Sequence, residues 1–471
     1  MTATSFKIEA DSRRNIARLA GSRVAVLGAA RSGVALAKLL VKHGSKVLLS
    51  DIRPAAEMTA VAAEANKFGF EVEFGGHSPA VLEADLICIS PGISLAVPIL
   101  REALARGITV AGELETASWF WNAPLIAVTG SNGKTTTTTL LGKIFAKAGK
   151  RAVVGGNIGT PLADQIRANP SGEAAVLEVS SFQLETIHTF HPHVAILMNL
   201  TANHLDRYRD FEEYAAAKLR LLKNMTASDY LIFNADDPFL LRQLKSVKVR
   251  KLPFSIEKEL PEGAFWQDGW IHWRWENGSG KVDCSNARLP GPHNRYNMIA
   301  ATMAALLFDL PLSAIQPAVC EFSGIAHRLE IVAQHNGLTF VNDSKATTVQ
   351  SLKFGLQSFS APIVLIAGGK DKGGDFGELS PLLKKNARAV VLIGQAAERM
   401  RRSWEEAVTL RRADTLEEAV RRAVELAEPG DVILLSPACS SFDMFADFED
   451  RGDQFKEIVR QWIQKSSSSG N

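Results

Sequence analysis

Cysteine is scarce in this sequence, and the few that occur lie far apart. The 471 residues contain four of them, Cys88, Cys284, Cys320 and Cys439. No two have the CxxC spacing of a zinc site, and four scattered cysteines cannot build a dense disulfide framework. A reducing compartment is therefore expected, and the sequence predicts a cytoplasmic protein.

An excess of charge of either sign is also missing. The chain has 53 Lys and Arg residues against 51 Asp and Glu residues, a formal net charge of +2. Nucleic acids and anionic membrane surfaces favour a strong positive excess, so neither partner is indicated. No apolar run approaches the roughly 18 residues of a membrane span, and the N-terminal residues lack the apolar core of a signal peptide. We expect no membrane insertion.

What the sequence does contain is the composition and pattern of a multidomain α/β protein. Hydrophobic residues make up 46% and charged residues 22%, an ordinary balance for a globular chain. Short apolar runs that end in glycine or polar residues alternate with helical patterns, which predicts parallel sheets covered by helices. At roughly 100–200 residues per domain, the length suggests about three domains.

Half of the eight tryptophans lie in one aromatic segment, residues 265–275. Aromatic side chains can stack on single-stranded nucleic acid when a basic groove accompanies them. Asp268 and Glu276 accompany these tryptophans instead, and the balanced net charge offers no such groove. We predict a β-hairpin whose tryptophans pack on the domain, with nucleic-acid binding as the alternative.

The first glycine loop, residues 28–33, follows an apolar run and opens a helical pattern. Gly28 permits a tight turn, Gly33 permits close packing of strand and helix, and the helix N-terminus suits an anion. Asp51 closes the next apolar run at about the separation expected of a ribose-binding acid. Because Ala30 replaces the glycine that admits a pyrophosphate, NAD(P), another nucleotide and a structural turn all stay open. The hypothesis of an NAD(P)-dependent oxidoreductase would rest on this loop alone.

A second glycine loop has the features of a P-loop. Residues 129–135 read TGSNGKT and lie between an apolar strand pattern and a helix. Backbone N–H groups of such a loop cradle ATP phosphates, Lys134 would neutralise them, and the Thr135 hydroxyl would bind Mg²⁺. Val128 stands where the general motif has its first glycine. A glycine turn with a chance lysine is the structural alternative.

Two further strand ends carry candidate metal ligands. LEVSS brings Glu178 to the end of one apolar run, and NLTANHLD brings His204 and Asp206 to the end of the next. A carboxylate and a neutral imidazole there could hold a second Mg²⁺ opposite Thr135. Each alone would more commonly be a surface or core residue, but their joint placement after a P-loop favours a metal site.

Eight segments, taken in order, carry a resemblance that extends over nearly the whole chain, from GAARSG to RGDQF. They are TGSNGKTT, LEVSSFQLE, NLTANHLDRY, AAAKLR, GPHNRYN, HRLE, NDSKAT and SPACSSFDMF. In these segments the sequence resembles the Mur ligase family. NDSKAT and SPACSSFD, together with the N-terminal GAARSG, resemble the member that adds D-glutamate.

The resemblance implies three α/β domains. They are a Rossmann-like UDP-binding domain over 1–111, a central P-loop ATPase-like domain over 112–324, and a C-terminal Rossmann-like, amino-acid-binding domain over 325–471. It implies a monomeric, ATP-dependent ligase that adds D-glutamate to UDP-N-acetylmuramoyl-L-alanine through an acyl phosphate, in cytoplasmic peptidoglycan precursor synthesis. ATP would be the co-substrate, with two Mg²⁺ ions. A ligase for a different amino acid on a muramoyl or folate-type substrate, and a non-catalytic nucleotide switch, are the alternatives.

The resemblance also assigns roles to particular residues. The catalytic residues it implies are Lys134, Glu178, His204 and Lys218. The metal ligands would be Thr135, Glu178, His204 and Lys218 as a carbamate. The ATP-binding residues would be Gly130, Ser131, Asn132, Gly133, Lys134, Thr135, Thr136, Asn294, Asn297, Arg328 and Asp343. Those for the UDP substrate are Ala30, Arg31, Ser32, Asp51, Arg53, Ser90, Asn157 and Ser180. Those for D-glutamate are Lys345, Thr347, Lys372, Ser441 and Phe448.

Overall fold

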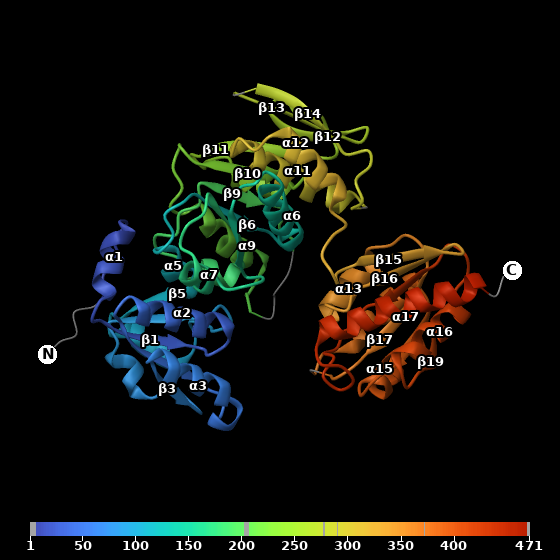
Figure 1. The fold of residues 1–471 in the computed structure, drawn as a ribbon, viewed down its shortest axis with the longest axis horizontal. Helices are drawn as coiled ribbons and strands as arrows, with labels where there is room; N and C mark the ends of the chain where they lie inside the picture. The colour runs from blue at the N-terminus through green and yellow to red at the C-terminus, as the bar shows by residue number, and fades with distance from the viewer. Residues whose placement is uncertain (1–5, 202–206, 277, 290, 372, 469–471) are drawn as a thin grey trace. The chain divides into compact units, whose positions relative to one another are not determined.

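The computed structural model describes residues 6–201, 207–276, 278–289, 291–371 and 373–468. The chain divides into two compact units, residues 1–322 and residues 323–471 (Figure 1). The first unit contains two β-sheets and the second contains one. Each unit has its own hydrophobic core, and each is described separately.

The first sheet of the first unit is fully parallel, with the strand order β3-β2-β1-β4-β5. Its strands are β1 (Arg23–Leu27), β2 (Lys46–Asp51), β3 (Glu71–Phe74), β4 (Leu86–Ile89) and β5 (Thr109–Gly112). The accompanying helices are α1 (Ser12–Leu19), α2 (Arg31–Lys42), α3 (Thr59–Phe68) and α4 (Pro98–Ala105). The predicted βαβ unit is therefore present, and its glycine loop joins β1 to α2.

The second sheet of this unit has nine strands in the order β14-β13-β12-β11-β10-β9-β6-β8-β7. Its strands are β6 (Leu125–Thr129), β7 (Ala152–Gly156), β8 (Ala174–Glu178), β9 (Val194–Leu197), β10 (Tyr230–Asn234), β11 (Arg250–Ser255), β12 (Gly263–Gln267), β13 (Trp270–Trp275) and β14 (Gly278–Asp283). Its helices are α5 (Glu113–Ser118), α6 (Lys134–Lys147), α7 (Leu162–Ala168), α8 (Ser181–Leu184), α9 (Phe211–Leu219), α10 (Pro238–Gln243), α11 (Pro292–Leu307) and α12 (Leu312–Glu321). The strands from β7 to β12 are parallel, so the carboxyl ends of β6, β8 and β9 lie at one edge.

The aromatic segment forms the predicted hairpin. Gln267 pairs with Trp270 across a two-residue turn, and β13 then pairs with β14 as a third antiparallel strand. The turn residues Asp268 and Gly269 both have positive φ, 49° and 83°. An Asp-Gly turn with two positive φ angles matches the twist of paired strands, which is why this dipeptide closes hairpins.

The connection between the two sheets of the first unit is a buried helix, because all six residues of α5 are buried. The Glu115 carboxylate accepts hydrogen bonds from the backbone N–H groups of residues 188, 189 and 190, at 3.0, 2.9 and 2.8 Å. It also accepts from the Trp119 indole at 2.9 Å and the Thr189 hydroxyl at 2.6 Å. Five donors thus satisfy one buried carboxylate, and they tie α5 to the loop before β9.

The second unit contains six strands in the order β15-β16-β20-β17-β18-β19. They are β15 (Glu330–His335), β16 (Leu338–Asn342), β17 (Ile363–Gly368), β18 (Ala387–Ile393), β19 (Thr409–Arg412) and β20 (Val432–Leu435). Only the β15–β16 pair is antiparallel among these strands. The helices are α13 (Val349–Gln357), α14 (Ser380–Asn386), α15 (Ala397–Trp404), α16 (Leu416–Leu426) and α17 (Phe448–Ser468).

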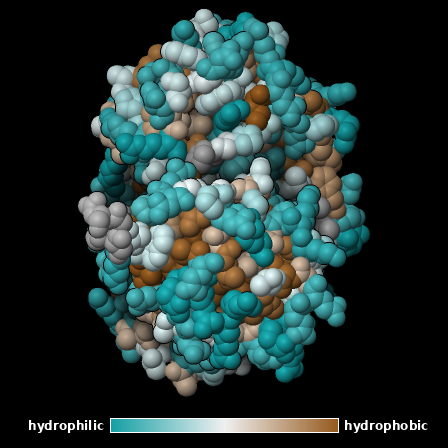
Figure 2. All heavy atoms as spheres, turned by 90° about the vertical axis from the view of Figure 1, so that its right-hand side faces the viewer, coloured by the Kyte–Doolittle hydropathy of each residue, from teal (hydrophilic) through white to brown (hydrophobic). Residues whose placement is uncertain are grey.

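The surface is mainly polar, as the composition leads one to expect. Hydrophilic residues cover much of the face shown in Figure 2, with smaller apolar areas between them. Ile52 and Phe442 are the large apolar side chains most exposed among the described residues, at 71% and 66%. Within the described part of the chain, no helix combines the length and the apolar character needed to cross a bilayer.

Candidate active site

The predicted P-loop lies between β6 and α6. Gly133 precedes the first helical residue with a φ of 85°, and a Cβ there would lie 2.3 Å from Asn297 Oδ1, so a larger residue would be strained and would displace that side chain. None of the described side chains caps α6, and the N-terminus of such a helix suits a phosphate. Lys134 Nζ donates to the carbonyl oxygens of Gly130 and Ser131, at 2.9 and 3.0 Å. The lysine therefore lies along the loop that would hold the phosphates.

Two of the predicted metal ligands meet beside this loop. The Thr135 hydroxyl donates to Glu178 Oε2 at 2.6 Å, across 43 residues of sequence. The other carboxylate oxygen accepts from Asn157 Nδ2 at 2.9 Å. Glu178 is buried, and its strand β8 is the direct neighbour of β6, which brings the two groups together. The structure thus brings Thr135, Glu178 and Asn157 together, while their roles stay predictions.

One of the groups that hold the loop itself, Tyr214, was not singled out by sequence reasoning. The buried Ser131 hydroxyl donates to the carbonyl oxygen of Thr201 at 2.9 Å and lies 3.0 Å from the Tyr214 hydroxyl. The Asn199 side chain accepts from the N–H of Asn132 at 2.9 Å and donates to its carbonyl at 3.2 Å. Helical spacing could have revealed Tyr214, because it precedes Lys218 by four residues and so shares its face of α9.

Lys218 is buried rather than solvated, with only 2% of its surface exposed. Its Nζ lies 3.4 Å from the Thr129 hydroxyl and 5.0 Å from the centre of the Tyr214 ring. Burial lowers the pKa of this amine far below its usual value; the positive charge of Lys134 lowers it further, while Glu178 opposes the shift. A solvated surface charge, the ordinary expectation for a lysine on a helix, is thereby excluded for Lys218.

Asn294 and Asn297, on the first turns of α11, also pack against the P-loop helix. Asn297 Oδ1 lies 3.3 Å from the Thr137 hydroxyl, and Asn297 Nδ2 donates to Asn294 Oδ1 at 2.9 Å. Both asparagines are buried. The structure therefore brings them to the nucleotide loop.

The residues predicted for the UDP substrate line the carboxyl edge of the first sheet. Asp51 accepts from the Ala29 N–H at 2.7 Å and from two nitrogens of Arg53 at 2.9 and 2.8 Å. The bond from Arg53 holds the pKa of Asp51 well below its usual range, although burial opposes this shift. Ser90 donates to the Gly28 carbonyl at 2.9 Å. A Cβ at Gly33 would lie 1.9 Å from that same carbonyl oxygen, which confirms the predicted close packing.

Four more predicted substrate residues lie where this edge meets the second sheet. Ala30 precedes α2, and Arg31 donates from the first turn to the carbonyl of Gly159 at 3.1 Å. Ser32 follows in the same turn. Ser180 caps α8, since its hydroxyl accepts from the Gln183 N–H at 3.3 Å. The helix N-termini that an anion would use are therefore formed.

In the second unit, Asp343 is buried at the end of β16. Its carboxylate accepts from the Ser436 hydroxyl at 2.8 Å and from the Leu329 N–H at 3.2 Å. Burial raises its pKa to about 7, against the effect of these hydrogen bonds and of the Arg328 charge. Arg328 is exposed between His327 and Leu329, which have positive φ angles of 63° and 44°.

The predicted D-glutamate residues lie on loops of the second unit. Lys345 Nζ lies 5.8 Å above the centre of the Phe448 ring, and the Ser344 hydroxyl donates to the Phe448 carbonyl at 2.8 Å. Thr347 N–H donates to the Lys345 carbonyl at 2.9 Å. Ser441 is buried, and its carbonyl accepts the N–H groups of residues 444 and 445. Lys345 and Phe448 are thus adjacent, and a backbone hydrogen bond ties Thr347 to Lys345.

Two predicted site residues, His204 and Lys372, lie outside the described residues, as does Asp206. Within the described residues, no three His, Cys, Asp or Glu side chains come close enough to hold a metal ion. The two candidate metal ligands that do meet, Thr135 and Glu178, both offer oxygen atoms of the type that Mg²⁺ prefers. They fit a magnesium ion shared with a nucleotide phosphate.

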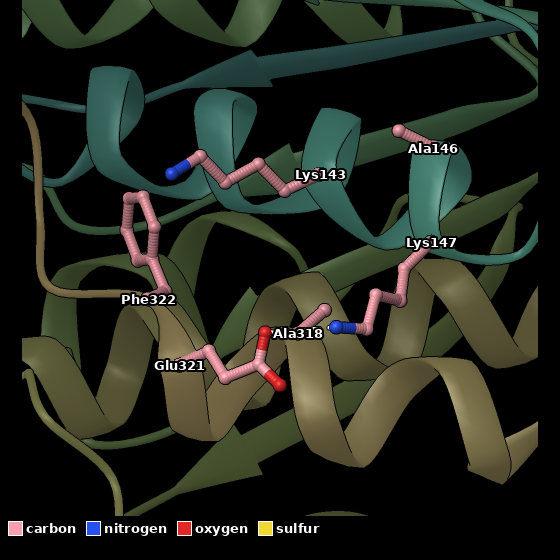
Figure 3. Close-up of a pocket in the computed structure, with 6 residues that line it drawn as sticks. All are labelled: Lys143, Ala146, Lys147, Ala318, Glu321 and Phe322. Atoms are coloured by element: carbon pink, nitrogen blue, oxygen red, sulfur yellow. Dashed lines mark hydrogen bonds and ion pairs between the residues drawn. The ribbon is translucent and has the colours of Figure 1, made fainter.

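A separate hollow of about 400 Å³ lies between the second half of α6 and the end of α12 (Figure 3). It is lined by Lys143, Ala146, Lys147, Ala318, Glu321 and Phe322. Lys147 pairs with Glu321 at 2.8 Å, and Lys143 Nζ lies 4.8 Å above the Phe322 ring. Both lysines have partners within the hollow, and the lining contains none of the predicted site residues. The candidate active site is at the opposite, N-terminal end of α6.

Models of known protein families match residues from all three sheets. The family model "Mur ligase MurD-like, N-terminal domain" matches residues 22–112, "Mur ligase middle domain" matches 128–305, and "Mur ligase, glutamate ligase domain" matches 327–439. The chain belongs to the Mur ligase family. The predicted fold class is confirmed for this Mur ligase, while the domain boundaries 111/112 and 324/325 stay predictions.

Two relatives that align with this Mur ligase along nearly their whole length carry the same name. UDP-N-acetylmuramoylalanine–D-glutamate ligase of Syntrophotalea carbinolica is 44% identical over 94% of this chain and 99% of its own. The ligase of the same name from Geotalea uraniireducens is 42% identical over 94% and 98%.

Solved structures of other ligases share the fold of this Mur ligase. UDP-N-acetylmuramate-alanine ligase of Thermotoga maritima aligns with a TM-score of 0.55 at 19% identity, over 93% of this chain and 99% of that one. A pseudomurein peptide ligase type C of Methanothermus fervidus gives 0.54 at 18%, over 94% and 100%. At these identities the likeness concerns the fold alone.

Proposed function

We propose that this Mur ligase joins D-glutamate to UDP-N-acetylmuramoyl-L-alanine, with ATP converted to ADP and phosphate. The observation that carries the proposal is the 2.6 Å contact of Thr135 with Glu178 beside the P-loop. The buried Lys218 belongs to the same site, although its helix α9 lies far from both residues in the sequence. The names of relatives that align along almost their whole length support the choice of D-glutamate. Peptidoglycan precursor synthesis is the process that such a ligase serves.

The chemistry follows from the poor reactivity of a carboxylate. The terminal carboxylate of the muramoyl substrate attacks the γ-phosphate of ATP and becomes an acyl phosphate, while ADP leaves. The amine of D-glutamate then attacks the acyl carbon, and phosphate leaves from the tetrahedral intermediate as the amide forms. Lys134 and the N–H groups of α6 stabilise the charge on the phosphoryl oxygens during the transfer.

For the nucleotide, we propose the loop residues 130–136 together with Asn294 and Asn297. Thr135 and Glu178 would hold Mg²⁺, with His204 and a carbamylated Lys218 completing a second site. When bound, the two ions would neutralise charge on the phosphates. Thr135 and Asn157 keep the Glu178 carboxylate oriented, since each donates to one of its oxygens. From the second unit, Arg328 and Asp343 are proposed as nucleotide-binding residues.

Carbamylation of Lys218 has a physical basis in its environment. CO₂ adds to an uncharged amine, and one N–H proton is released to solvent as the carbamate forms. Burial lowers the pKa of Lys218 and so favours the uncharged amine. The resulting carbamate is anionic and has oxygen atoms, whereas an ammonium group would repel a metal ion. We therefore propose that the buried side chain acts as an oxygen ligand.

For the two acidic substrates, we propose separate groups of residues. The diphosphate of the UDP substrate would bind at the N-terminus of α2 with Ala30, Arg31 and Ser32, and the uridine near Asp51, Arg53 and Ser90. Asn157 and Ser180 would orient the muramoyl group. The carboxylates of D-glutamate would bind Lys345, Thr347, Lys372 and Ser441, with Phe448 as an apolar wall. We also propose that the protein is a monomer in the cytoplasm.

The decisive experiment measures phosphate release with a panel of amino acids. Purified protein with ATP, Mg²⁺ and UDP-N-acetylmuramoyl-L-alanine is expected to release phosphate with D-glutamate and not with L-glutamate or L-lysine. Lys134→Ala serves as the control for contaminating ATPase, because it removes the phosphate-binding amine. Equal release with L-glutamate or L-lysine would contradict the assignment. A fluorescence change of NADH on mixing would instead favour the oxidoreductase alternative, and size-exclusion chromatography tests the monomer.

A further inference from the structure

A polar cluster lies at the carboxyl ends of β2 and β3 and includes none of the site residues named so far. The buried Ser50 hydroxyl lies 2.5 Å from Glu73 Oε1 and 2.6 Å from His77 Nδ1. Glu73 Oε2 accepts the Ser78 hydroxyl at 2.6 Å, and Glu73 Oε1 accepts the Ser78 N–H at 3.1 Å. Four residues from two strand ends thus share one short hydrogen-bond chain that ends on the His77 ring.

The Glu73 carboxylate sets the direction of the protons in this chain. Burial disfavours ionisation of Glu73, but the bonds from Ser50 and Ser78 outweigh it and hold the pKa of Glu73 below its ordinary value. An ionised carboxylate only accepts, so the Ser50 proton points to Glu73. The Gly76 carbonyl is a poorer acceptor for that proton, at 3.5 Å. Ser50 can then only accept from His77, which requires a proton on Nδ1.

The other ring nitrogen of His77 is consequently a hydrogen-bond acceptor. Burial lowers the pKa of His77, against the charges of Glu73 and Asp51, so the ring is neutral at pH 7. With the single proton on Nδ1, Nε2 carries a lone pair. The ring is half-buried, and no described residue is hydrogen-bonded to Nε2.

The cluster lies where the base of a bound nucleotide would reach. Strand order places β2 between β1 and β3, and neighbouring strands lie about 4.8 Å apart, so the ends of β1 and β3 are roughly 10 Å apart. With phosphates at the loop after β1, the ribose and base extend along the same edge. Residues 75 and 76 are tied to that edge, because their N–H groups donate to the carbonyls of Arg53 and Asp51, at 2.8 and 3.4 Å.

We propose that His77 recognises the uracil base of the substrate, with Nε2 accepting the N3–H of the ring. Uracil carries a hydrogen on N3, whereas N3 of cytosine carries a lone pair that would face the lone pair of Nε2. Ser50, Glu73 and Ser78 are positioning residues, because they fix which ring nitrogen is protonated. The inference rests on the proposed UDP substrate and adds the residue that selects its base.

Competition between UDP and CDP for a fluorescent UDP analogue tests the proposal without any ligation step. The wild-type protein is expected to bind UDP about tenfold more tightly than CDP, the effect of about one hydrogen bond. His77→Asn keeps a donor near Ser50 and removes the acceptor, so it should abolish most of this preference. His77→Gln places an acceptor near the position of Nε2 and should keep it. An unchanged UDP-to-CDP ratio in His77→Asn would overturn the proposal.

Nitrogen NMR of histidine-labelled protein supplies a second, independent measurement. The His77 signals, assigned by their loss in His77→Asn, should show a protonated Nδ1 and an unprotonated Nε2 that shifts when UDP is added. A proton on Nε2 in the free protein would overturn the proposal. If UDP selection depended on His77 but no D-glutamate were ligated, the proposed function would fail while this inference stood.

Discussion

The amine of Lys218 lies 3.4 Å from the hydroxyl of Thr129, the last residue of β6, and both side chains are buried. Thr129 itself donates to the Val179 carbonyl at 2.7 Å, so its oxygen can accept from the lysine. Nothing in this arrangement resembles a solvated surface lysine. The pair connects α9 to the strand that leads into the P-loop, and it explains why a lysine on a helix belongs to the candidate active site.

We predict that Lys218→Ala loses activity by on the order of 100-fold, because a ligand of the second metal is removed. Acetate should restore part of the activity, since its carboxylate can occupy the space of the carbamate. Lys218→Arg should stay inactive, because it keeps a positive charge and cannot take up CO₂. Steady-state phosphate release measures the activity of Lys218→Ala, with and without acetate, and of Lys218→Arg. Substitution of an exposed lysine, Lys245→Ala, is the matched control. Full activity of Lys218→Ala without added carboxylate would return Lys218 to a structural role.

Thr135→Val should lower kcat/KM for ATP by about 100-fold, because valine has the shape of threonine but no oxygen for a metal ion or for Glu178. Thr135→Ser retains the hydroxyl and should stay within a few-fold of the original enzyme. Rates measured over a range of Mg²⁺ concentrations give a further readout. The valine variant should need more Mg²⁺ for half-maximal rate. Equal Mg²⁺ dependence of the two variants would argue against Thr135 as a metal ligand.

Stability should fall with rising pH through the buried Glu113, whose pKa burial raises from the ordinary 4.5 to about 8. Between these values the folded chain keeps a proton that the unfolded chain has lost, so this contribution is complete below about pH 4.5 and lost as the pH rises to about 8. Glu113→Gln removes the titration. Urea unfolding should show the variant gaining stability relative to the original protein between pH 5 and pH 8. Parallel pH curves for both proteins would contradict the prediction.

Glu115→Gln should destabilise the first unit by about 3 kcal/mol, since an amide cannot accept all the hydrogen bonds that the carboxylate accepts and its NH₂ would face donors. The indole of Trp119, bonded to Glu115 at 2.9 Å, is one of the eight tryptophans whose fluorescence reports unfolding. Urea unfolding followed by tryptophan fluorescence is expected to shift to lower urea. Glu113→Gln is the control on the same helix, and a similar shift in both variants would point to a general effect of substitution in α5.

Elements that are specified locally could be predicted from the sequence. The apolar run before TGSNGKT became β6, and the loop and α6 followed in the expected order. The aromatic hairpin was also predictable, because Asp268 and Gly269 favour its turn. The predicted P-loop and strand ends came from such signals, whereas the role of Lys218 came from the family resemblance alone, and its burial was not predicted.

Relationships that depend on strand order could not be predicted in the same way. The meeting of Thr135 with Glu178 requires β8 to lie beside β6, although β7 precedes β8 in the chain. The burial of Glu113 and Glu115 could not be predicted either, because their segment, ELETAS, has the composition of a solvated helix. The hydrogen bonds of His77 join residues 27 positions apart, and no motif marks them.

The buried helix α5 has a consequence for how this chain could be divided or recombined. Domain connections are ordinarily exposed and make few contacts. Here one continuous apolar cluster includes Val24 and Leu36 of the first sheet region, Leu114 of α5, and Leu177 of the second sheet. Cutting the gene at this point would strip both halves of shared packing and leave each prone to aggregate. Chimaeras with other family members should therefore exchange the first two sheets as a pair.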